Sequence, residues 1–298
     1  MKLQTAERRQ AKIKASLQGP SGSGKTMGAL HIAYGLCKNW EKVAVIDTEN
    51  YSASLYAHLG KFKVLNIGAP FTPERYMEAL QACTTGGAEV IIIDSISHEW
   101  EGSGGILDIH SGMVGNSFTN WSKVTPRHNA FVQAILQSPV HVIATTRTKQ
   151  DYILSERNGK QVPEKVGLKS VTRDGMDYEF TLVMDLDIKH NAVASKDRTG
   201  LFMDKPEFRL TPAIGEQILA WCQQGSTKSP EESFTEQIQA CNIYQELKSL
   251  FTHNPKFQQS HLHLFSKRKN DLVAANANLA AINSLTSKFT TNGNGDSK

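Results

Sequence analysis

The sequence predicts an α/β fold: a mostly parallel central sheet with β-hairpin additions and a small helical C-terminal appendage. Short apolar runs bounded by charged residues, of which residues 90–94 (VIIID) are the strongest example, are typical of strands buried on both faces. These runs alternate with segments that carry apolar residues at helical spacing. The alternation indicates βαβ units and a parallel sheet with helices on both sides.

Residues 12–144 supply the expected parallel strands and their helices. Strands are expected at residues 12–18, 42–47, 90–94 and 140–144, and helices at residues 26–39, 72–83 and 127–136. Thr72 can cap the second helix, and Pro73 fits its first turn because no amide hydrogen is needed there. Residues 97–126 are rich in Gly, Ser and Asn, so we expect an irregular, mobile excursion.

The remaining chain has a different pattern. Residues 152–155 and 161–166 flank Asn158-Gly159, a pair typical of a two-residue hairpin turn, and further strands are expected at residues 180–188 and 191–195. Residues 223–233 (QQGSTKSPEES) have the composition of a linker, which divides the chain into a domain at 1–225 and a helical region at 226–298. In that region we expect helices at residues 234–251 and 271–289, followed by a disordered tail.

Composition and charge place the chain among ordinary globular proteins. The net charge of +4, from 33 basic and 29 acidic residues, is too small to indicate a nucleic-acid-binding protein by itself. No stretch approaches the roughly 18 apolar residues of a membrane span, and the N-terminus lacks the apolar core of a secretory signal. The isolated Cys37, Cys83, Cys222 and Cys241 indicate reduced cysteines, not a disulfide framework or a zinc site. We therefore expect a cytoplasmic protein that binds no membrane.

A glycine-rich octapeptide between the first expected strand and helix fits G-x-x-x-x-G-K-[ST], the P-loop pattern. Its glycines let backbone N–H groups converge on a polyphosphate, and the helix that follows adds the positive end of its dipole. Lys25 would reach the β- and γ-phosphates of ATP, and the Thr26 hydroxyl would bind Mg²⁺. The expected ATP-binding residues of this segment are Gly19, Ser21, Gly22, Ser23, Gly24, Lys25, Thr26 and Met27.

Residues 90–94 place a carboxylate, Asp94, at the end of a buried strand. A Walker B acid stands at such a position and holds Mg²⁺ through water. An aspartate that only caps the following loop is the alternative. Because Ser95 and not a glutamate follows Asp94, the general base that polarises the attacking water must come from elsewhere in the chain.

Residues 46–49 (IDTE) resemble the RecA-like ATPases, in which a strand ending in Ile-Asp-x-Glu presents its Glu beside the γ-phosphate. The resemblance implies that Glu49 is the general base and that Asp47 is structural or close to Mg²⁺. An exposed loop acid is the alternative for Glu49, and Glu99 is the rival base. The strand after Walker B ends in a γ-phosphate sensor in that family. The usual glutamine is missing here, so Thr146 would be the sensor and Arg147 would contact phosphate or DNA.

Residues 194–200 (ASKDRTG) match the Lys-x-Arg that ring-forming RecA-fold ATPases carry near a late strand. By this resemblance, Arg198 would stabilise charge in the transition state of a neighbouring subunit's ATP, as arginine fingers do, and Lys196 would add a second positive charge. A solvated hairpin turn is the alternative reading of these residues.

The whole stretch from residue 11 to residue 221 is similar to the phage-encoded RecA-core nucleotide-binding proteins, some of which are ATP-dependent single-strand annealing proteins. The similarity is carried, in this order, by residues 19–26, 46–49, 92–101, 125–129, 165–167, 173–177 and 195–199. It implies a RecA-like P-loop NTPase that uses ATP and Mg²⁺, assembles into a ring or filament and acts on single-stranded DNA. A phage origin would place the protein in the bacterial host cytoplasm.

The segment from residue 147 to residue 173 has seven basic and three acidic residues, a local charge of +4 that equals the net charge of the whole chain. RecA-like proteins place a DNA-binding loop at this point of the chain, and a basic hairpin can lie along a phosphate backbone. A charged hairpin that is merely solvated is the alternative. The expected DNA contacts are Arg147, Lys149, Arg157, Lys160, Lys165, Lys169 and Arg173, and a second candidate contact is the aromatic excursion with Trp100, Phe118, Trp121 and Lys123.

Three functions are compatible with the sequence. The first is a DNA- or assembly-stimulated ATPase in phage-type recombination or annealing. The second is a P-loop kinase that transfers phosphate to a small molecule, with the segment 147–173 as its lid. The third is a nucleotide-gated binding protein with little turnover.

Overall fold

The computed structural model describes the backbone of residues 8, 10–157, 160–225 and 230–291; within these ranges, side chains at 150–157, 160–167, 230, 233 and 275–291 are not described. Its contacts divide the chain into two compact units, Ala11–Gln224 and a second unit of Gly225–Lys298 with Met1–Gln10.

A twisted sheet forms the centre of the larger unit. Among the described residues, nine strands build it in the order β3-β2-β4-β5-β1-β7-β8-β9, with β6 paired to β5 outside this path. The parallel part consists of β3 (Lys63–Asn66), β2 (Val43–Asp47), β4 (Val90–Asp94), β5 (His141–Arg157), β1 (Lys14–Gly19) and β7 (Leu182–Leu186). The strands β8 (Asn191–Asp197) and β9 (Phe208–Arg209) add an antiparallel edge. The expected α/β fold with a mostly parallel sheet is confirmed.

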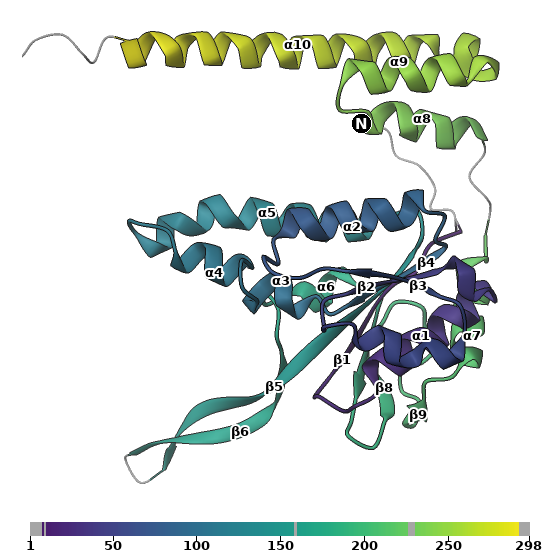
Figure 1. Cartoon of the computed structure of the whole chain (residues 1–298), viewed down its shortest axis with the longest axis vertical. Coiled ribbons are helices and arrows are strands. Elements are labelled where there is room, and N and C mark those ends of the chain that lie inside the picture. Colours follow the sequence, from purple (N-terminus) through teal and green to yellow (C-terminus); the bar gives the residue numbers. More distant parts are fainter. Residues whose placement is uncertain (1–7, 9, 158–159, 226–229, 292–298) are drawn as a thin grey trace, which may run out of the picture. The chain divides into compact units, whose positions relative to one another are not determined.

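Helices cover both faces of the sheet, as Figure 1 shows. The helices α1 (Lys25–Cys37) and α7 (Pro212–Cys222) pack on one face, and α2 (Pro73–Thr85) and α5 (Ser117–Gln137) pack on the other. Because successive residues of a strand point to opposite faces, Val45 belongs to the core under α1 while Ile46 belongs to the core under α2. This two-sided burial explains why the central strands are continuously apolar.

The expected irregular excursion at residues 97–126 is wrong, because most of it is helical. It contains α3 (Ser97–Glu101), α4 (Ile106–Ser111) and the first ten residues of α5. Asn116 caps α5 by accepting a hydrogen bond from the backbone N–H of Phe118 at 2.8 Å. Val124, His128, Phe131 and Ile135 are buried at helical spacing, and this packing keeps α5 continuous through Pro126.

The basic hairpin is confirmed, and its first strand is continuous with the strand expected at residues 140–144. Strand β5 begins in the sheet and continues to Arg157, where it pairs antiparallel with β6 (Lys160–Ser170). The two strands form an arm that projects from the sheet (Figure 1). The turn residues Asn158 and Gly159 lie outside the described residues. A short helix, α6 (Met176–Glu179), follows the arm.

Several short elements were not expected from the sequence. These are the 3₁₀ helices η1 (Trp40–Lys42), η2 (Ser52–Leu59) and η3 (Pro255–Phe257), together with β3, β9, α6 and α7.

The smaller unit contains α8 (Pro230–Ala240), α9 (Tyr244–His253), η3 and α10 (Gln258–Thr291). The expected helix at 234–251 is wrong as a single helix. It is interrupted between α8 and α9, where Ile243 is extended with φ −131°. The Arg268 guanidinium compensates the break by donating to the freed carbonyl of Cys241 at 2.8 and 3.1 Å. Helix α10 begins 13 residues before the expected helix at 271–289. Residues 292–298 of the expected tail lie outside the described residues.

Among the described residues, no helix combines the length and the apolar character that crossing a membrane would require.

Candidate nucleotide site

The P-loop connects β1 to α1, and its geometry depends on two glycines with positive φ. Gly22 has φ 79° and Gly24 has φ 84°, a region that residues with a Cβ adopt at a cost. Gly24 is the N-cap of α1 and supplies no side-chain hydrogen bond, so the first amide groups of this 13-residue helix are not capped by a side chain. The Ser23 hydroxyl in the same loop is buried and has no hydrogen-bond partner among the described residues. The loop therefore presents donors that suit a bound anion.

Lys25 is the first residue of α1, one position before the expected start of the helix. Its ammonium group donates to the carbonyl oxygens of Gly19 and Pro20, at 2.8 Å each, so it lies inside the curve of the loop. Burial lowers the pKa of Lys25, while the negative charges of Asp94 and Glu49 raise it.

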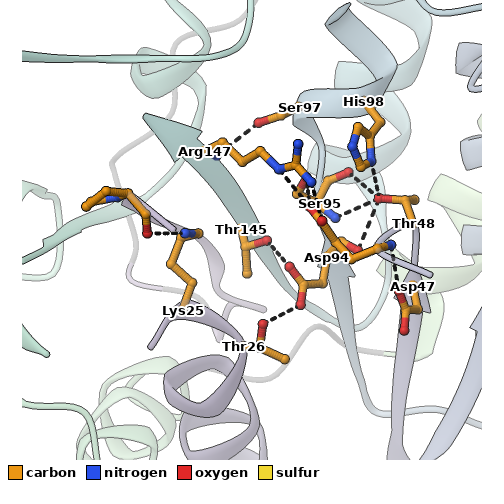
Figure 2. Close-up of polar contacts among 12 residues, drawn as sticks. Lys25, Thr26, Asp47, Thr48, Asp94, Ser95, Ser97, His98, Thr145 and Arg147 are labelled. Carbon is orange, nitrogen blue, oxygen red and sulfur yellow. Dashed lines mark hydrogen bonds and ion pairs between the residues drawn. The ribbon is translucent and has the colours of Figure 1, made fainter. Parts of the chain in front are cut away.

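Asp94 ends strand β4 and is held between two threonine hydroxyls, as Figure 2 shows. Thr26 Oγ1 donates to Asp94 Oδ2 at 2.6 Å, and Thr145 Oγ1 donates to Asp94 Oδ1. Burial raises the pKa of Asp94, and the hydrogen bonds from Thr145 and Thr26 oppose that effect. A carboxylate and a hydroxyl within hydrogen-bond distance form the oxygen donor set that Mg²⁺ prefers beside a P-loop.

The end of β2 is fixed by Asp47 and Thr48. The Asp47 carboxylate accepts from the backbone N–H groups of Glu49 at 2.7 Å and Ala53 at 2.8 Å. The Thr48 N–H donates to the Asp94 carbonyl at 2.8 Å, which joins the ends of β2 and β4. Asp47 therefore shapes the turn that carries Glu49, in agreement with the structural alternative considered for it.

Glu49 lies at the same edge of the sheet and is bound by Arg147 in a two-pronged ion pair. Arg147 Nε donates to Glu49 Oε1 at 2.9 Å, and a second guanidinium nitrogen donates to Oε2. Ser95 Oγ donates to Oε1 at 3.0 Å. Burial raises the pKa of Glu49, but the hydrogen bonds and charge of Arg147, together with His98 and Ser95, outweigh burial and lower the net pKa. The side chain is therefore an ionised carboxylate at neutral pH.

Glu99, the rival general base, has a different environment. Its side chain is buried and contacts His128 Nδ1 with both carboxylate oxygens at 3.1 Å. Trp100 packs its ring against the edge of the same histidine. Glu49 lines the cleft beside the P-loop, whereas Glu99 faces α5.

Three consecutive residues at the point where β5 leaves the sheet have distinct environments. Thr145 binds Asp94, and Arg147 binds Glu49. The hydroxyl of Thr146, expected to be the γ-phosphate sensor, is buried and lies 3.3 Å from Ser16 Oγ of β1. Since successive strand residues point to opposite faces, Thr145 and Arg147 share the side of the cleft and Thr146 does not. Thr145 was not predicted from the sequence. The signal that could have found it is the alternation of side chains along β5, which places Thr145 on the same side as Arg147.

The side chains enclose a cleft of about 510 Å³. It is lined by the P-loop residues Ser21, Gly22, Gly24, Lys25 and Thr26, and by Glu49, Asp94, Glu101, Arg147 and Lys149, among others. This volume is within the range of small-molecule and cofactor pockets. The described cleft thus unites Lys25 and Thr26, Glu49 and Asp94 from three separate segments.

Lys196 and Arg198 do not line the described cleft of their own chain. Lys196 Nζ donates to the carbonyl oxygen of Asp177 at 3.0 Å and to that of Tyr178. Arg198 donates to the same Tyr178 carbonyl at 3.2 Å, and its side chain is exposed. The two cations therefore converge on the C-terminal end of α6, and their contact with a second subunit stays a prediction.

The expected DNA contacts fall into two groups. Arg157, Lys160 and Lys165 are on the arm, with Arg157 opposite Lys160 in the register, and their side chains lie outside the described residues. The others surround the base of the arm: besides Arg147, Lys149 binds Glu101, Lys169 binds Asp174 at 2.9 Å, and Arg173 donates to Asn129 at 3.4 Å.

Comparison with known proteins agrees with this geometry. A family model described as an AAA domain matches residues 11–209. The RecA proteins of Lactiplantibacillus pentosus and Lactiplantibacillus plantarum are each 35% identical to this chain over 105 residues. That alignment covers 33% of this chain and 27% of each RecA protein. Together, the family and the partial similarity support a nucleotide-binding ATPase with a RecA-like P-loop core.

Proposed function

This chain belongs to the AAA domain family, and we propose that it is a Mg²⁺-dependent ATPase whose turnover is stimulated by single-stranded DNA during recombination or annealing. The observation that carries the ATPase part is the convergence of Lys25, Thr26, Asp94 and Glu49 on one cleft. The DNA part is supported by the similarity to RecA and by the basic arm rooted at this cleft.

Binding of the nucleotide is the task of the P-loop. The uncapped amides at the start of α1, the Lys25 ammonium and the orphaned Ser23 hydroxyl are donors that fit a polyphosphate. Thr26 and Asp94 would hold Mg²⁺, the latter through water, and the ion would neutralise charge on the phosphate oxygens. In the described structure these two side chains bind each other, so both are already oriented for a shared ion.

Hydrolysis requires a base for the attacking water, and Glu49 is the ionised carboxylate in the right place. As the water oxygen bonds to the γ-phosphorus, the bond to the bridging β-γ oxygen breaks and Glu49 accepts the water's proton. Both oxygens of Glu49 are occupied by Arg147, and one also accepts from Ser95. Arg147 must therefore release at least one of these oxygens before Glu49 can act as a base.

Arg147 also gives a physical route from the DNA to the cleft. It belongs to β5, and the same strand continues without interruption into the arm. A nucleic acid bound along the arm would bias the position of β5 and hence the ion pair with Glu49. This is the basis of the proposed stimulation of hydrolysis.

Phosphate release with and without an oligo(dT) strand tests the proposal. We expect slow Mg²⁺-dependent release from the wild type, faster release with oligo(dT), and none above background from Lys25→Ala. Release that oligo(dT) leaves unchanged would contradict the DNA part. ADP formed without free phosphate, and only when a nucleoside or sugar is added, would instead indicate the small-molecule kinase.

A further inference from the structure

A pocket of about 640 Å³ lies beside the nucleotide cleft at the base of the arm. Its aromatic wall is made by Trp100 and Trp121, and its basic wall by Lys149, Lys169 and Arg173. The two walls come from α3 and α5 on one side and from β5, β6 and the loop after β6 on the other. Nothing in the ATPase scheme uses these two tryptophans.

The aromatic wall is a packed set of rings. The indoles of Trp100 and Trp121 are stacked, with centroids 6.0 Å apart and planes 22° apart. His110 stacks on Trp121 at 4.1 Å, and His128 meets Trp100 edge-on at 5.6 Å. Because His128 is itself held by the buried Glu99, the Trp100 end of this set of rings is anchored to the core. Aromatic surfaces anchored in this way bind a planar partner at low entropic cost.

The basic wall carries cations in exchangeable pairs. Lys149 binds Glu101, Lys169 binds Asp174, and Arg173 donates to Asn129. The lysine side chains of the two ion pairs are 64% and 53% exposed, and such surface pairs contribute little to stability. A phosphate group can therefore replace Glu101 or Asp174 as the partner of a lysine at small cost.

We infer that this pocket binds one unpaired nucleobase, stacked on Trp100 and Trp121, with a neighbouring phosphate on Lys149, Lys169 and Arg173. A planar base beside an anion is the chemistry that an indole wall facing three cations recognises. The base has to be unpaired, because a base inside a duplex cannot offer its face to a side chain. The inference rests on the proposed function, and single-stranded DNA is the occupant to which it commits.

The pocket shares a wall with the nucleotide cleft. Glu101, Lys149 and Val171 line both spaces, so the Glu101–Lys149 ion pair stands between them. A phosphate that draws Lys149 away from Glu101 changes the charge at the edge of the cleft that contains Glu49 and Arg147. Binding of a nucleobase in the pocket can therefore affect ATP hydrolysis in the cleft through the Glu101–Lys149 ion pair.

Tryptophan fluorescence and anisotropy test the inference directly. In a Trp40→Phe/Trp221→Phe background only Trp100 and Trp121 report, and we expect oligo(dT) to quench them. Labelled oligo(dT) should bind Trp121→Leu about tenfold or more weakly, the order expected for one stacked base, and Trp121→Phe should recover most of the affinity. The control is Val114→Ala, which lies just before the same helix and is 97% exposed outside the pocket, and it should bind as wild type.

The outcomes separate this inference from the proposed function. Suppose that oligo(dT) binds and stimulates hydrolysis but does not quench the fluorescence, and that it binds Trp121→Leu and Val114→Ala equally well. The inferred base pocket is then wrong and the proposed function stands. If oligo(dT) does not bind the wild type at all, both fail. Quenching by thymidine monophosphate as strong as that by oligo(dT) would assign the pocket to a free nucleotide and overturn single-stranded DNA as its occupant. Equal quenching by oligo(U) would support the base pocket and extend it to RNA.

Discussion

The carboxylates that end β2 and β4 differ in what surrounds them, and this difference assigns their tasks. The Asp47 carboxylate accepts hydrogen bonds from two backbone N–H groups and shapes a turn. Asp94 is held by threonine hydroxyls, whereas Glu49 is paired with a guanidinium. Of the three, only Glu49 is both paired with a partly exposed cation and placed on the wall of the cleft. We therefore propose Glu49 as the general base.

Replacing Glu49 by glutamine tests that assignment. We expect Glu49→Gln to bind ATP but to release phosphate about 100-fold or more slowly, the usual contribution of a general base. Glu78→Gln, which changes an exposed glutamate on α2, is the matched control and should hydrolyse ATP as wild type. Steady-state phosphate release with nucleotide binding measured in parallel distinguishes the two variants. A Glu49→Gln variant with wild-type turnover would move the base elsewhere.

His141 gives a prediction about stability and pH. Burial, with smaller effects of Lys12 and Lys14, lowers its pKa from 6.5 to about 3, and its Nδ1 accepts a hydrogen bond from the Ile13 N–H at 3.1 Å. The unfolded chain thus binds a proton between about pH 6.5 and pH 3 that the folded chain does not, so stability falls as the pH falls through that window.

In His141→Asn the amide oxygen can accept the same hydrogen bond but does not titrate. We expect denaturant unfolding of the wild type to lose stability between pH 6.5 and pH 4 more steeply than that of His141→Asn. Parallel curves for the two proteins over this range would show that His141 is not neutral in the folded state.

At the scale of single residues, the sequence predicts the residues that belong to a motif or stand at the end of a buried strand. The P-loop, Asp94 and Glu49 follow from motifs and strand ends, and the structure brings them to one cleft. No motif names the partners of these residues, because Arg147 lies 98 positions from Glu49 and Thr145 lies 51 positions from Asp94. A motif specifies which group does chemistry, whereas its neighbours depend on the order of strands in the sheet.

At the scale of elements, strand β5 connects the sheet, the nucleotide cleft and the arm. Its first residues complete the sheet between β4 and β1, its middle binds Asp94 and Glu49, and its last residues pair with β6 in the arm. A single strand that does all three connects the nucleotide cleft to the arm, and its pairing with β6 shifts register between Asp151 and Tyr152.

Shortening the arm tests this coupling. Lys149 pairs with Lys169 in the register, so an Asn-Gly turn between them can replace residues 150–168 and close a short hairpin. We expect this variant to keep its melting temperature and its basal phosphate release but to lose stimulation by oligo(dT). Replacing only Asn158-Gly159 with Gly-Gly is the control for the turn. Full stimulation in the shortened variant would exclude the arm as the route.

The elements that sequence reasoning missed share a physical cause. Residues 97–126 have loop-like composition, yet tertiary burial of Val124, Phe131 and Ile135 selects a helix there. In the second unit, α10 begins at Gln258 because the core around Phe257 and Leu272 orders that stretch. Buried central strands were predictable from their apolar runs, whereas helices that depend on packing partners far along the chain were not.

At the scale of the whole molecule, each unit has its own hydrophobic core. Two clusters lie on the faces of the sheet in Ala11–Gln224, and a third, with Phe234, Ile238 and Leu247, lies in the C-terminal unit. Lys196 and Arg198, exposed or partly exposed on β8 and the turn after it, are the groups whose proposed task needs a second copy of the chain.

Arg198→Ala tests that need. If Arg198 acts on a neighbouring subunit's ATP, the variant should bind nucleotide normally but release phosphate at least tenfold more slowly, and wild-type turnover per subunit should rise with protein concentration. Lys205→Ala, which removes another exposed cation near β8, should leave turnover unchanged. Wild-type turnover in Arg198→Ala, independent of concentration, would show that the site is complete in one chain.

Calorimetric titration with a non-hydrolysable ATP analogue, in the presence and absence of Mg²⁺, examines the premise beneath all of these predictions. The cleft at the start of α1 should bind the analogue with 1:1 stoichiometry, more tightly with Mg²⁺, and at least about tenfold more weakly in Lys25→Ala, since one phosphate-bound cation is lost. A folded wild-type protein that gives no heat of binding and protects no P-loop amide from exchange, with Mg²⁺ present, would contradict the account.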